Sequence, residues 1–270
     1  MTAWEAAVLG LIQGLTEFLP ISSSGHLVIG QTIFGLRGDH LPFDVVVHGA
    51  TLGAIAIHFR HRLIELLSSV DLDYFGKLGL GTLPALIVGL TLRHPIERLF
   101  DAPLVVAGLL AVTGTMLLSL YWRRPGRRGS ERSTTGWAEG SEEPTWAAAF
   151  LIGCVQAVAI LPGISRSGST IVAAIWLGVA PAAAAEFSFL LGIPAIGGAI
   201  VLLTGDVGTA ARGGEGTELL LGAGTALISG LVAITLVFRL LAGHGFRRFG
   251  FYCWIVAALF GIYVITRGAA

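Results

Sequence analysis

Apolar stretches separated by short polar segments make up most of the chain. Six of these stretches are roughly 17 to 25 residues long, which is the length at which an α-helix crosses the hydrocarbon core of a bilayer. We therefore predict an all-α integral membrane protein. The predicted transmembrane helices are residues 43–59, 76–92, 102–122, 184–203, 217–242 and 249–267.

Two further apolar regions, residues 3–36 and 146–180, are each too long for one crossing and are interrupted near the middle. Pro20 and Pro162 break them, and a serine-rich turn follows each proline. Irregular backbone is tolerated at membrane depth only where protein or water surrounds it. We interpret both regions as re-entrant helical hairpins, with two short complete crossings as the alternative.

The two hairpin regions share a sequence pattern. The Gly-x-x-Gln segments at 10–13 and 153–156 match, and so do the serine-rich turns after the prolines. Each half of the chain then contains one hairpin and three transmembrane helices. An odd number of crossings inserts the second half in the opposite direction, so we predict an inverted repeat. Its units are residues 1–122 and 145–270, joined by a polar linker at 123–144.

The composition supports a membrane protein. The chain has 54% hydrophobic and 13% charged residues and a mean hydropathy of +0.80, whereas a soluble domain carries about 25% charged residues. Thirty-eight glycines suit the close approach of membrane helices. The net charge is zero, and the one basic run, Arg123 to Arg132, lies between predicted spans, which argues against nucleic acid as a partner.

The basic residues predict the orientation. With the linker in the cytoplasm, eleven of them lie inside and five outside, as the positive-inside rule expects. Both chain ends should then face outward. The first residues lack a basic start and a cleavage site, so we expect no removable signal peptide. Cys154 and Cys253 lie in apolar runs, so we predict neither a disulfide nor a metal cluster.

The first hairpin contains a polar pair, Gln13 and Glu17, spaced to share one helix face just before Pro20. A carboxylate at that depth costs at least about 2.5 kcal/mol to insert. Glu17 should therefore face protein, water or a cation. The alternative is a protonated glutamate with a structural role.

A serine at the start of a new helix can cap it, and the remaining N–H groups of the first turn attract anions. If the two turns converge from opposite leaflets, they could hold one phosphate-bearing ligand, although each serine could also be only a cap. The candidate ligand-binding residues of the turns are Ser22, Ser24, Gly25, Ser165, Ser167 and Gly168.

The two copies differ where chemistry requires it. Ser23 corresponds to Arg166, and His26 corresponds to Ser169. Arg166 offers a planar fork for phosphate oxygens and is the one basic residue that the predicted topology leaves at membrane depth. His26 could act as nucleophile or general acid, or could be a hydrogen-bonded packing residue.

Other polar residues are weaker candidates. Asp44 and His48, one turn apart, could border the same cavity or serve only structure. We expect Glu186 in the first turn of the 184–203 helix, where it suits the helix dipole. Gln156, the counterpart of Gln13, should hydrogen-bond between helices.

The segments Gln13-Gly-Leu-Thr-Glu-Phe-Leu-Pro-Ile-Ser-Ser-Ser-Gly-His26 and Pro162-Gly-Ile-Ser-Arg-Ser-Gly-Ser-Thr170 resemble the undecaprenyl-diphosphate phosphatase family, also called bacitracin-resistance proteins. The resemblance covers nearly the whole chain apart from the linker. It implies an inverted-repeat membrane fold in the cell membrane. It also implies release of inorganic phosphate from a C55 isoprenoid diphosphate, which recycles the lipid carrier of cell-wall synthesis.

The resemblance also implies roles. It assigns the acidic pair to Gln13 and Glu17, a catalytic serine and histidine to Ser23 and His26, and a catalytic arginine to Arg166. It implies a divalent cation, Mg²⁺ or Ca²⁺, near Glu17. Many family members have glutamate where this chain has Gln13, which weakens metal binding by that residue. We expect the undecaprenyl diphosphate lipid to enter from the outer leaflet, with His26 or Ser23 as the nucleophile.

We consider two rival functions, of which one remains open. A transporter or flippase of a lipid phosphate is the first, because secondary carriers also use inverted repeats with broken helices. A type 2 phosphatidic-acid phosphatase is the second. We discount it, because this chain lacks, in the required order, the Lys and Arg-Pro motif before Ser-Gly-His and the later His that follows the Arg in that family. The oligomeric state, including a homodimer, is not determined by the sequence.

Overall fold

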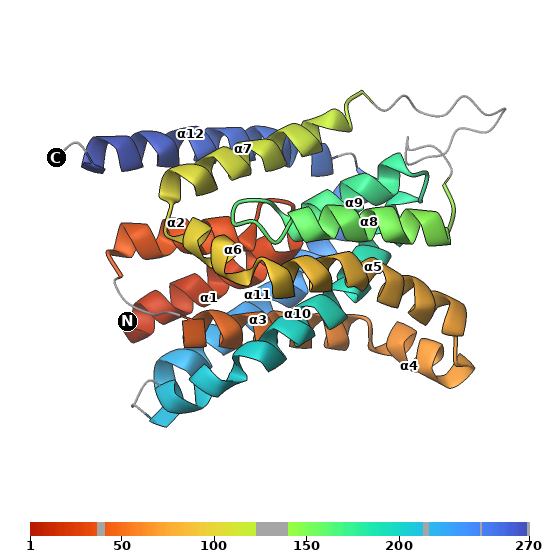
Figure 1. The fold of residues 1–270 in the computed structure, drawn as a ribbon, viewed down its shortest axis with the longest axis horizontal. Helices are drawn as coiled ribbons and strands as arrows, with labels where there is room; N and C mark the ends of the chain where they lie inside the picture. Colours follow the sequence, from red (N-terminus) through yellow and green to blue (C-terminus); the bar gives the residue numbers. More distant parts are fainter. Residues whose placement is uncertain (37–40, 123–139, 213–215, 244, 269–270) are drawn as a thin grey trace.

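The computed structural model describes the whole chain except residues 37–40, 123–139, 213–215, 244 and 269–270 (Figure 1). The described residues fold into helices that run mostly along one direction, with both termini at one end of the bundle. Among these described residues, five helices are long and apolar enough to cross a membrane, and a bent pair raises that number to six. The prediction of an all-α, multi-pass membrane protein is therefore confirmed.

The first half of the chain begins with two short helices joined at the Pro20 turn. Three longer helices, α3, α5 and α7, follow with the short α4 and α6 between them. The helices of this half are α1 (Ala3–Phe18), α2 (Ser23–Phe34), α3 (Leu41–His58), α4 (Arg60–Ser69), α5 (Leu72–Thr91), α6 (Arg93–Phe100) and α7 (Pro103–Ser119).

The second half also begins with two short helices. Its helices are α8 (Trp146–Val158), α9 (Arg166–Trp176), α10 (Pro181–Arg212), α11 (Gly216–Ala242), the 3₁₀ turn η1 (Phe246–Arg248) and α12 (Phe249–Gly268). The predicted linker falls largely in residues 123–139, outside the described residues.

Helix pairs cross between the halves. α1 packs chiefly against α11, and α8 packs chiefly against α5. Glycines make both crossings close: a side chain at Gly14 would collide with the carbonyl oxygen of Ala226, and one at Gly153 would collide with that of Gly81. Small residues at such crossings let backbones approach without a hydrophobic driving force. α7 and α12 form a third such pair, one helix from each half (Figure 1).

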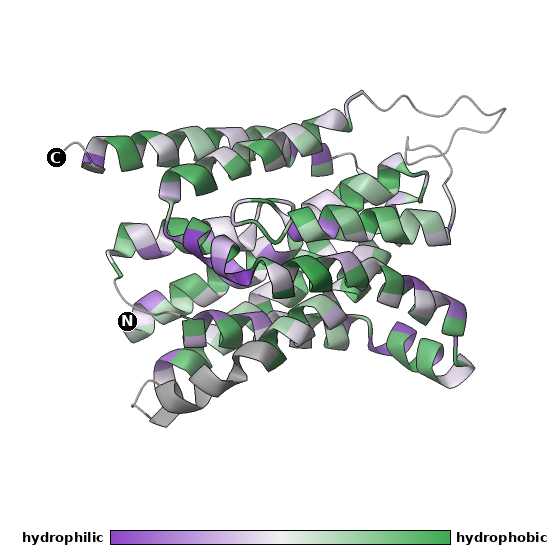
Figure 2. Cartoon of the chain, in the orientation of Figure 1, coloured by the Kyte–Doolittle hydropathy of each residue, from purple (hydrophilic) through white to green (hydrophobic). Residues whose placement is uncertain are grey.

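An aromatic cluster packs in the interior between α1, α10 and α11. The rings of Phe18 on α1 and Phe189 on α10 meet edge to face with centroids 5.4 Å apart. Phe59, which lies between α3 and α4, and Phe238 on α11 complete the cluster, with centroids 6.1 Å apart. Outward-facing residues are apolar as well: Ile228 on α11 is 67% exposed and Leu259 on α12 is 63% exposed, and Figure 2 shows hydrophobic residues along both α7 and α12. That exposed apolar surface suits contact with lipid.

A charged cluster at the end opposite the termini joins the two halves. Arg62 Nε donates to Glu186 Oε1 over 2.9 Å, and Lys77 Nζ donates to Glu143 Oε2 over 3.1 Å. Glu186 lies beyond the first turn of its helix because α10 begins at Pro181. The expectation of a dipole-stabilising position for Glu186 is therefore wrong, and its partner is Arg62.

Candidate active site

The two interrupted regions meet in the interior of the bundle. A β-carbon at Gly168 would lie 3.0 Å from Cβ of Pro20, and one at Gly25 would lie 3.2 Å from Cα of Gly163. The turn of each half therefore touches the turn of the other. Figure 1 shows both turns about midway between the two ends of the bundle.

Glu17 is the polar centre of this contact, and its side chain is only 6% exposed. Ser23 Oγ donates to its Oε2 over 2.6 Å, and Gln13 Nε2 donates to the same oxygen over 3.1 Å. Arg166 Nη2 donates to Oε1 over 2.7 Å. Each of these bonds stabilises the ionised carboxylate in surroundings with little water.

Arg166 is fixed at two points. Besides Glu17, its Nη1 donates to the backbone oxygen of Ser188 over 3.1 Å. The guanidinium lies directly on Gly192, where a β-carbon would collide with Nη1. The charges of Glu17 and Arg166 cancel. A further anion or cation at this site must therefore bind together with an ion of opposite charge.

Gln13 leaves one polar atom without a partner. Its Nε2 is bonded to Glu17, whereas its buried Oε1 has no hydrogen-bond partner among the described residues. An unsatisfied buried acceptor costs about 1–3 kcal/mol. Gln13 Oε1 is therefore available to accept a hydrogen bond from a ligand or to bind a cation.

Both serine turns cap the helix that follows. Ser22 Oγ accepts from the N–H of Gly25 over 3.2 Å, and Ser165 Oγ accepts from the N–H of Gly168 over 3.0 Å. The next hydroxyls are close by: Ser24 Oγ lies 3.3 Å from Ser22 Oγ, and Ser167 Oγ lies 3.4 Å from Ser165 Oγ. The first N–H groups of α2 and α9 precede the helical ladder, as in known anion sites at helix starts.

Asp44 and His48 take different positions. His48 Nε2 lies 3.8 Å from Glu17 Oε2, and His48 Nδ1 donates to the backbone oxygen of Asp44 over 2.7 Å. The carboxylate of Asp44 accepts from Gln31 Nε2 over 3.2 Å. His48 therefore borders the Glu17 cluster, whereas the bond of Asp44 leads to α2.

His26 points to α12. Its Nδ1 lies 2.8 Å from the backbone oxygen of Ser22, and its Nε2 lies 3.0 Å from the hydroxyl of Tyr252. Both ring nitrogens are thus engaged by groups other than Glu17 and Arg166. The structure brings Gln13, Glu17, Ser23, His48 and Arg166 together, whereas His26 contacts Ser22 and Tyr252.

Several residues of the site carried no signal in the sequence. Ser188 supplies a backbone oxygen to Arg166, and a backbone contact is invisible to motif reasoning. Thr113 holds the second turn: its Oγ1 donates to Gly163 O over 2.8 Å and accepts from the N–H of Ser165 over 3.0 Å. A threonine in an apolar span looks like any other helix residue.

The described residues contain no group of three or more His, Cys, Asp or Glu side chains placed to hold a metal ion. Gln13 Oε1 and the Glu17 carboxylate are the oxygens at hand. One carboxylate beside a guanidinium is too little charge for a divalent ion held by protein alone. It suits a hard cation that binds together with phosphate oxygens, as Mg²⁺ commonly does.

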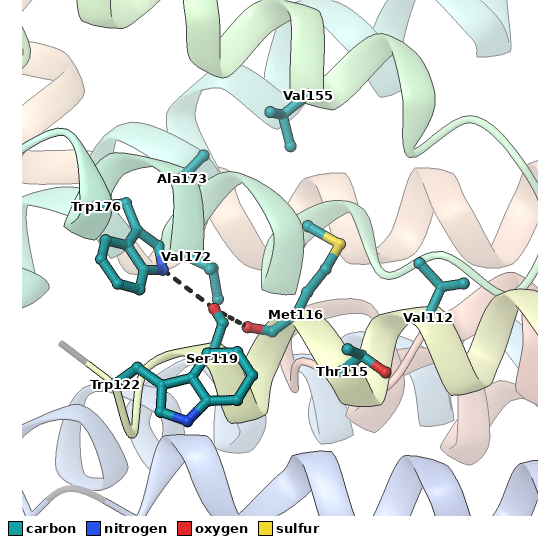
Figure 3. Close-up of a pocket in the computed structure, with 9 residues that line it drawn as sticks. All are labelled: Val112, Thr115, Met116, Ser119, Trp122, Val155, Val172, Ala173 and Trp176. Atoms are coloured by element: carbon teal, nitrogen blue, oxygen red, sulfur yellow. Dashed lines mark hydrogen bonds between the residues drawn. The ribbon is translucent and has the colours of Figure 1, made fainter.

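An open groove of about 490 Å³ lies elsewhere, between α7, α8 and α9 (Figure 3). Its walls are mostly apolar and include Met116 and Trp122. Trp176 Nε1 donates to Ser119 Oγ over 3.1 Å across one wall. Its lining holds none of the predicted site residues, so the chemistry is to be sought at Glu17.

Comparisons with known proteins agree with the motifs. The family model described as bacitracin resistance protein BacA matches residues 6–259. An undecaprenyl-diphosphatase of Desulfosudis oleivorans is 42% identical over 94% of this chain and 96% of its own. Proteins of the same name from Rhodopirellula baltica and Desulforapulum autotrophicum are 40% identical over 92% of this chain (93% of the relative) and 36% identical over 96% (97% of the relative).

Proposed function

Because this chain belongs to the family of bacitracin resistance protein BacA, we propose that it is a membrane phosphatase that hydrolyses undecaprenyl diphosphate. The products are undecaprenyl phosphate and inorganic phosphate. This reaction recycles the lipid carrier of peptidoglycan synthesis, supports cell-wall growth and cell shape, and accounts for resistance to bacitracin. The observation that carries the proposal is the buried contact of Ser23 with Glu17 beside Arg166.

Ser23 is the proposed nucleophile. Its hydroxyl already donates to Glu17 Oε2 over 2.6 Å, the arrangement that a nucleophile needs with its base. Ser23 Oγ attacks the terminal phosphorus while its proton passes to Glu17, and the bond from that phosphorus to the bridging oxygen breaks. Glu17 passes the proton on to the departing undecaprenyl phosphate and is ionised again. It then takes a proton from water, whose oxygen attacks the phosphoserine phosphorus, and returns this proton to Ser23 Oγ as inorganic phosphate leaves. His26, the alternative nucleophile, has both nitrogens engaged elsewhere.

Arg166 and the turn N–H groups are the proposed phosphate holders. The guanidinium neutralises charge that builds on the phosphoryl oxygens, which is the largest contribution to phosphoryl transfer. The starts of α2 and α9 are held by the serine hydroxyls of the two turns, Ser22, Ser24, Ser165 and Ser167. His48 lies beside Glu17 at the same site. Positioning of the diphosphate between them supplies the rest of the rate gain.

The proposed cofactor is Mg²⁺ or Ca²⁺. Gln13 Oε1 and Glu17 would hold it together with the diphosphate, and the bound ion would neutralise negative charge on the substrate oxygens. The ion is thereby expected to bind weakly before the substrate arrives.

We also propose that the two interrupted regions are re-entrant hairpins of an inverted repeat. The exchange of partners, α1 with α11 and α8 with α5, supports this, since the same helices of each half take the same roles. In the cell membrane, the positive-inside rule favours the orientation with both termini outside. We propose that the site opens to this outer face. The isoprenoid tail then stays in the lipid of the outer leaflet.

The test is phosphate release from undecaprenyl diphosphate by the purified protein in detergent. Ser23→Ala and Glu17→Gln should each lower kcat at least about 1,000-fold. Ser68→Ala, the same change on exposed α4, is the control and should keep full activity. Phosphate trapped during turnover should label Ser23. A label on His26 would contradict the proposed mechanism. Substrate binding by the wild-type protein without hydrolysis would favour a carrier.

A further inference from the structure

Tyr252 joins the last helix to the first serine turn. It lies on α12, more than two hundred positions from His26, and its hydroxyl lies 3.0 Å from His26 Nε2. The two rings are nearly parallel, with an interplanar angle of 7° and centroids 5.7 Å apart. The next residue on α12, Cys253, is buried with its Sγ 3.8 Å from the backbone oxygen of Pro20. α12 therefore holds both sides of the turn.

The partners of His26 define its protonation. The Ser22 oxygen is a carbonyl, which can only accept, so Nδ1 carries a hydrogen and donates it. In the neutral ring Nε2 is then an acceptor, and the Tyr252 hydroxyl donates to it. The ring is fixed at both ends.

The turn that His26 holds is strained. Ser22 has φ 70° and ψ 101°, a conformation that costs a residue with a side chain about 1–3 kcal/mol. Its carbonyl oxygen accepts from the backbone N–H of His26 over 3.1 Å as well as from Nδ1. Ser23 follows directly, so the direction of the Ser22 backbone decides whether Ser23 Oγ reaches Glu17.

We propose that Tyr252 is a positioning residue for hydrolysis, acting through His26 to hold the strained Ser22 turn in the conformation that presents Ser23 to Glu17. The inference rests on the proposed phosphatase function. It gives His26 a role that is not nucleophilic, and it makes α12 of the second half a part of the first half's catalytic turn.

Tyr252→Phe removes the hydroxyl and keeps the ring. Its kcat for undecaprenyl diphosphate should fall about 10-fold with a smaller change in KM, because the presentation of Ser23 is loosened while Arg166 and the second turn still hold the phosphate. Tyr263→Phe, the same change on the same helix, is the matched control: Tyr263 packs its ring under Arg267. It should keep both constants.

A double variant separates positioning through His26 from a general effect on the fold. Tyr252→Phe should cost nothing further in a His26→Ala background, within about 2-fold, because the bond is already absent. If it lowers the rate by the same factor in both backgrounds, Tyr252 acts by another route and the proposal fails. Full activity of Tyr252→Phe also overturns it.

A measurement without turnover keeps the inference separate from the proposed function. In protein with ¹⁵N-labelled histidine, Tyr252→Phe should shift the Nε2 resonance of His26, and Tyr263→Phe should not. An unmoved resonance overturns the bond itself. If the bond is present but the wild-type protein releases no phosphate from undecaprenyl diphosphate, the proposed function fails, and the positioning role fails with it.

Discussion

At the scale of single residues, the site depends on the carboxylate of Glu17. Its carboxylate is buried and accepts from a guanidinium, a hydroxyl and an amide. Removal of one member of a buried ion pair leaves an uncompensated charge and costs about 3–5 kcal/mol. Arg166 therefore stabilises the fold as well as the proposed reaction, and a loss of activity in its variants must be separated from a loss of folded protein.

The amide at position 13 predicts weak binding of a divalent cation. Gln13→Glu would place a second carboxylate next to Glu17, since the present side-chain atoms are 3.1 Å apart. Two adjacent carboxylates repel each other unless a cation or proton intervenes. We expect the variant to gain thermal stability on addition of Mg²⁺ and to need at least about 10-fold less Mg²⁺ for half-maximal effect.

The measurement is thermal unfolding in detergent, first with chelator and then with rising Mg²⁺. The exchanged pair, Gln13→Glu with Glu17→Gln, keeps a single carboxylate and serves as control, so it should show no gain. Equal Mg²⁺ dependence of the Gln13→Glu variant and the wild-type protein would show that position 13 does not face the ion.

The sequence predicted part of this site. Four-residue spacing placed Gln13 and Glu17 on one helix face, and the structure joins their side chains. The match of Ser23 with Arg166 in the two copies pointed to the other two residues that hydrogen-bond Glu17. Tyr252 could not be predicted, because a tyrosine in an apolar helix looks like a packing residue. Its partner lies in the other half of the chain.

At the scale of helices, glycines set how closely the halves approach. Gly14 on α1 faces the backbone of α11, and Gly153 on α8 faces the backbone of α5. Because backbone oxygens cannot rotate out of the way as side chains do, an added methyl group must push the helices apart. These crossings position α1 and α8, whose ends carry Glu17 and the second turn.

Gly14→Ala should lower the free energy of unfolding by about 1–3 kcal/mol, as overpacking commonly does. The expected result is a lower midpoint of thermal unfolding in detergent. Gly224→Ala on α11 is the control, because a β-carbon there meets nothing within 4 Å. An unchanged midpoint for Gly14→Ala would mean that α1 and α11 are less closely packed than the contact with Ala226 indicates.

Helix boundaries followed hydropathy for most of the long helices, but α10 (Pro181–Arg212) continues beyond the end predicted at residue 203. The predicted span 217–242 corresponds to α11, Gly216–Ala242. Hydropathy missed α4 and α6 because these short helices are rich in charge. α6 and α7 meet at an angle of 98°, at a break where Ala102 precedes Pro103 and leaves the helical conformation.

At the scale of the whole molecule, the ends of the bundle differ in chemistry. The termini lie at one end (Figure 1). The opposite end carries the basic residues of α4 and η1, and Figure 2 shows α4 rich in hydrophilic residues. Of the counted basic residues, Arg37 and those of the linker lie outside the described residues. The proposed orientation, with both termini outside, depends on the distribution of charge alone, and it can be tested directly.

Reporter fusions in cells give that test. Alkaline phosphatase fused after residue 270 should be active, because it folds outside the cell membrane, and green fluorescent protein inserted between residues 123 and 139 should be fluorescent. Each reporter at the other site is the control and should be silent. Fluorescence from the C-terminal fusion would reverse the orientation and place the proposed site toward the cytoplasm.

The exchange of partner helices has a consequence for a severed chain. α1 lacks its main neighbour if residues beyond the linker are absent, and α8 lacks its own if α5 is absent. Two fragments cut between residues 123 and 139 should each be degraded when produced singly. Produced together they should assemble as a heterodimer with activity, because every interlocking surface is then supplied in trans.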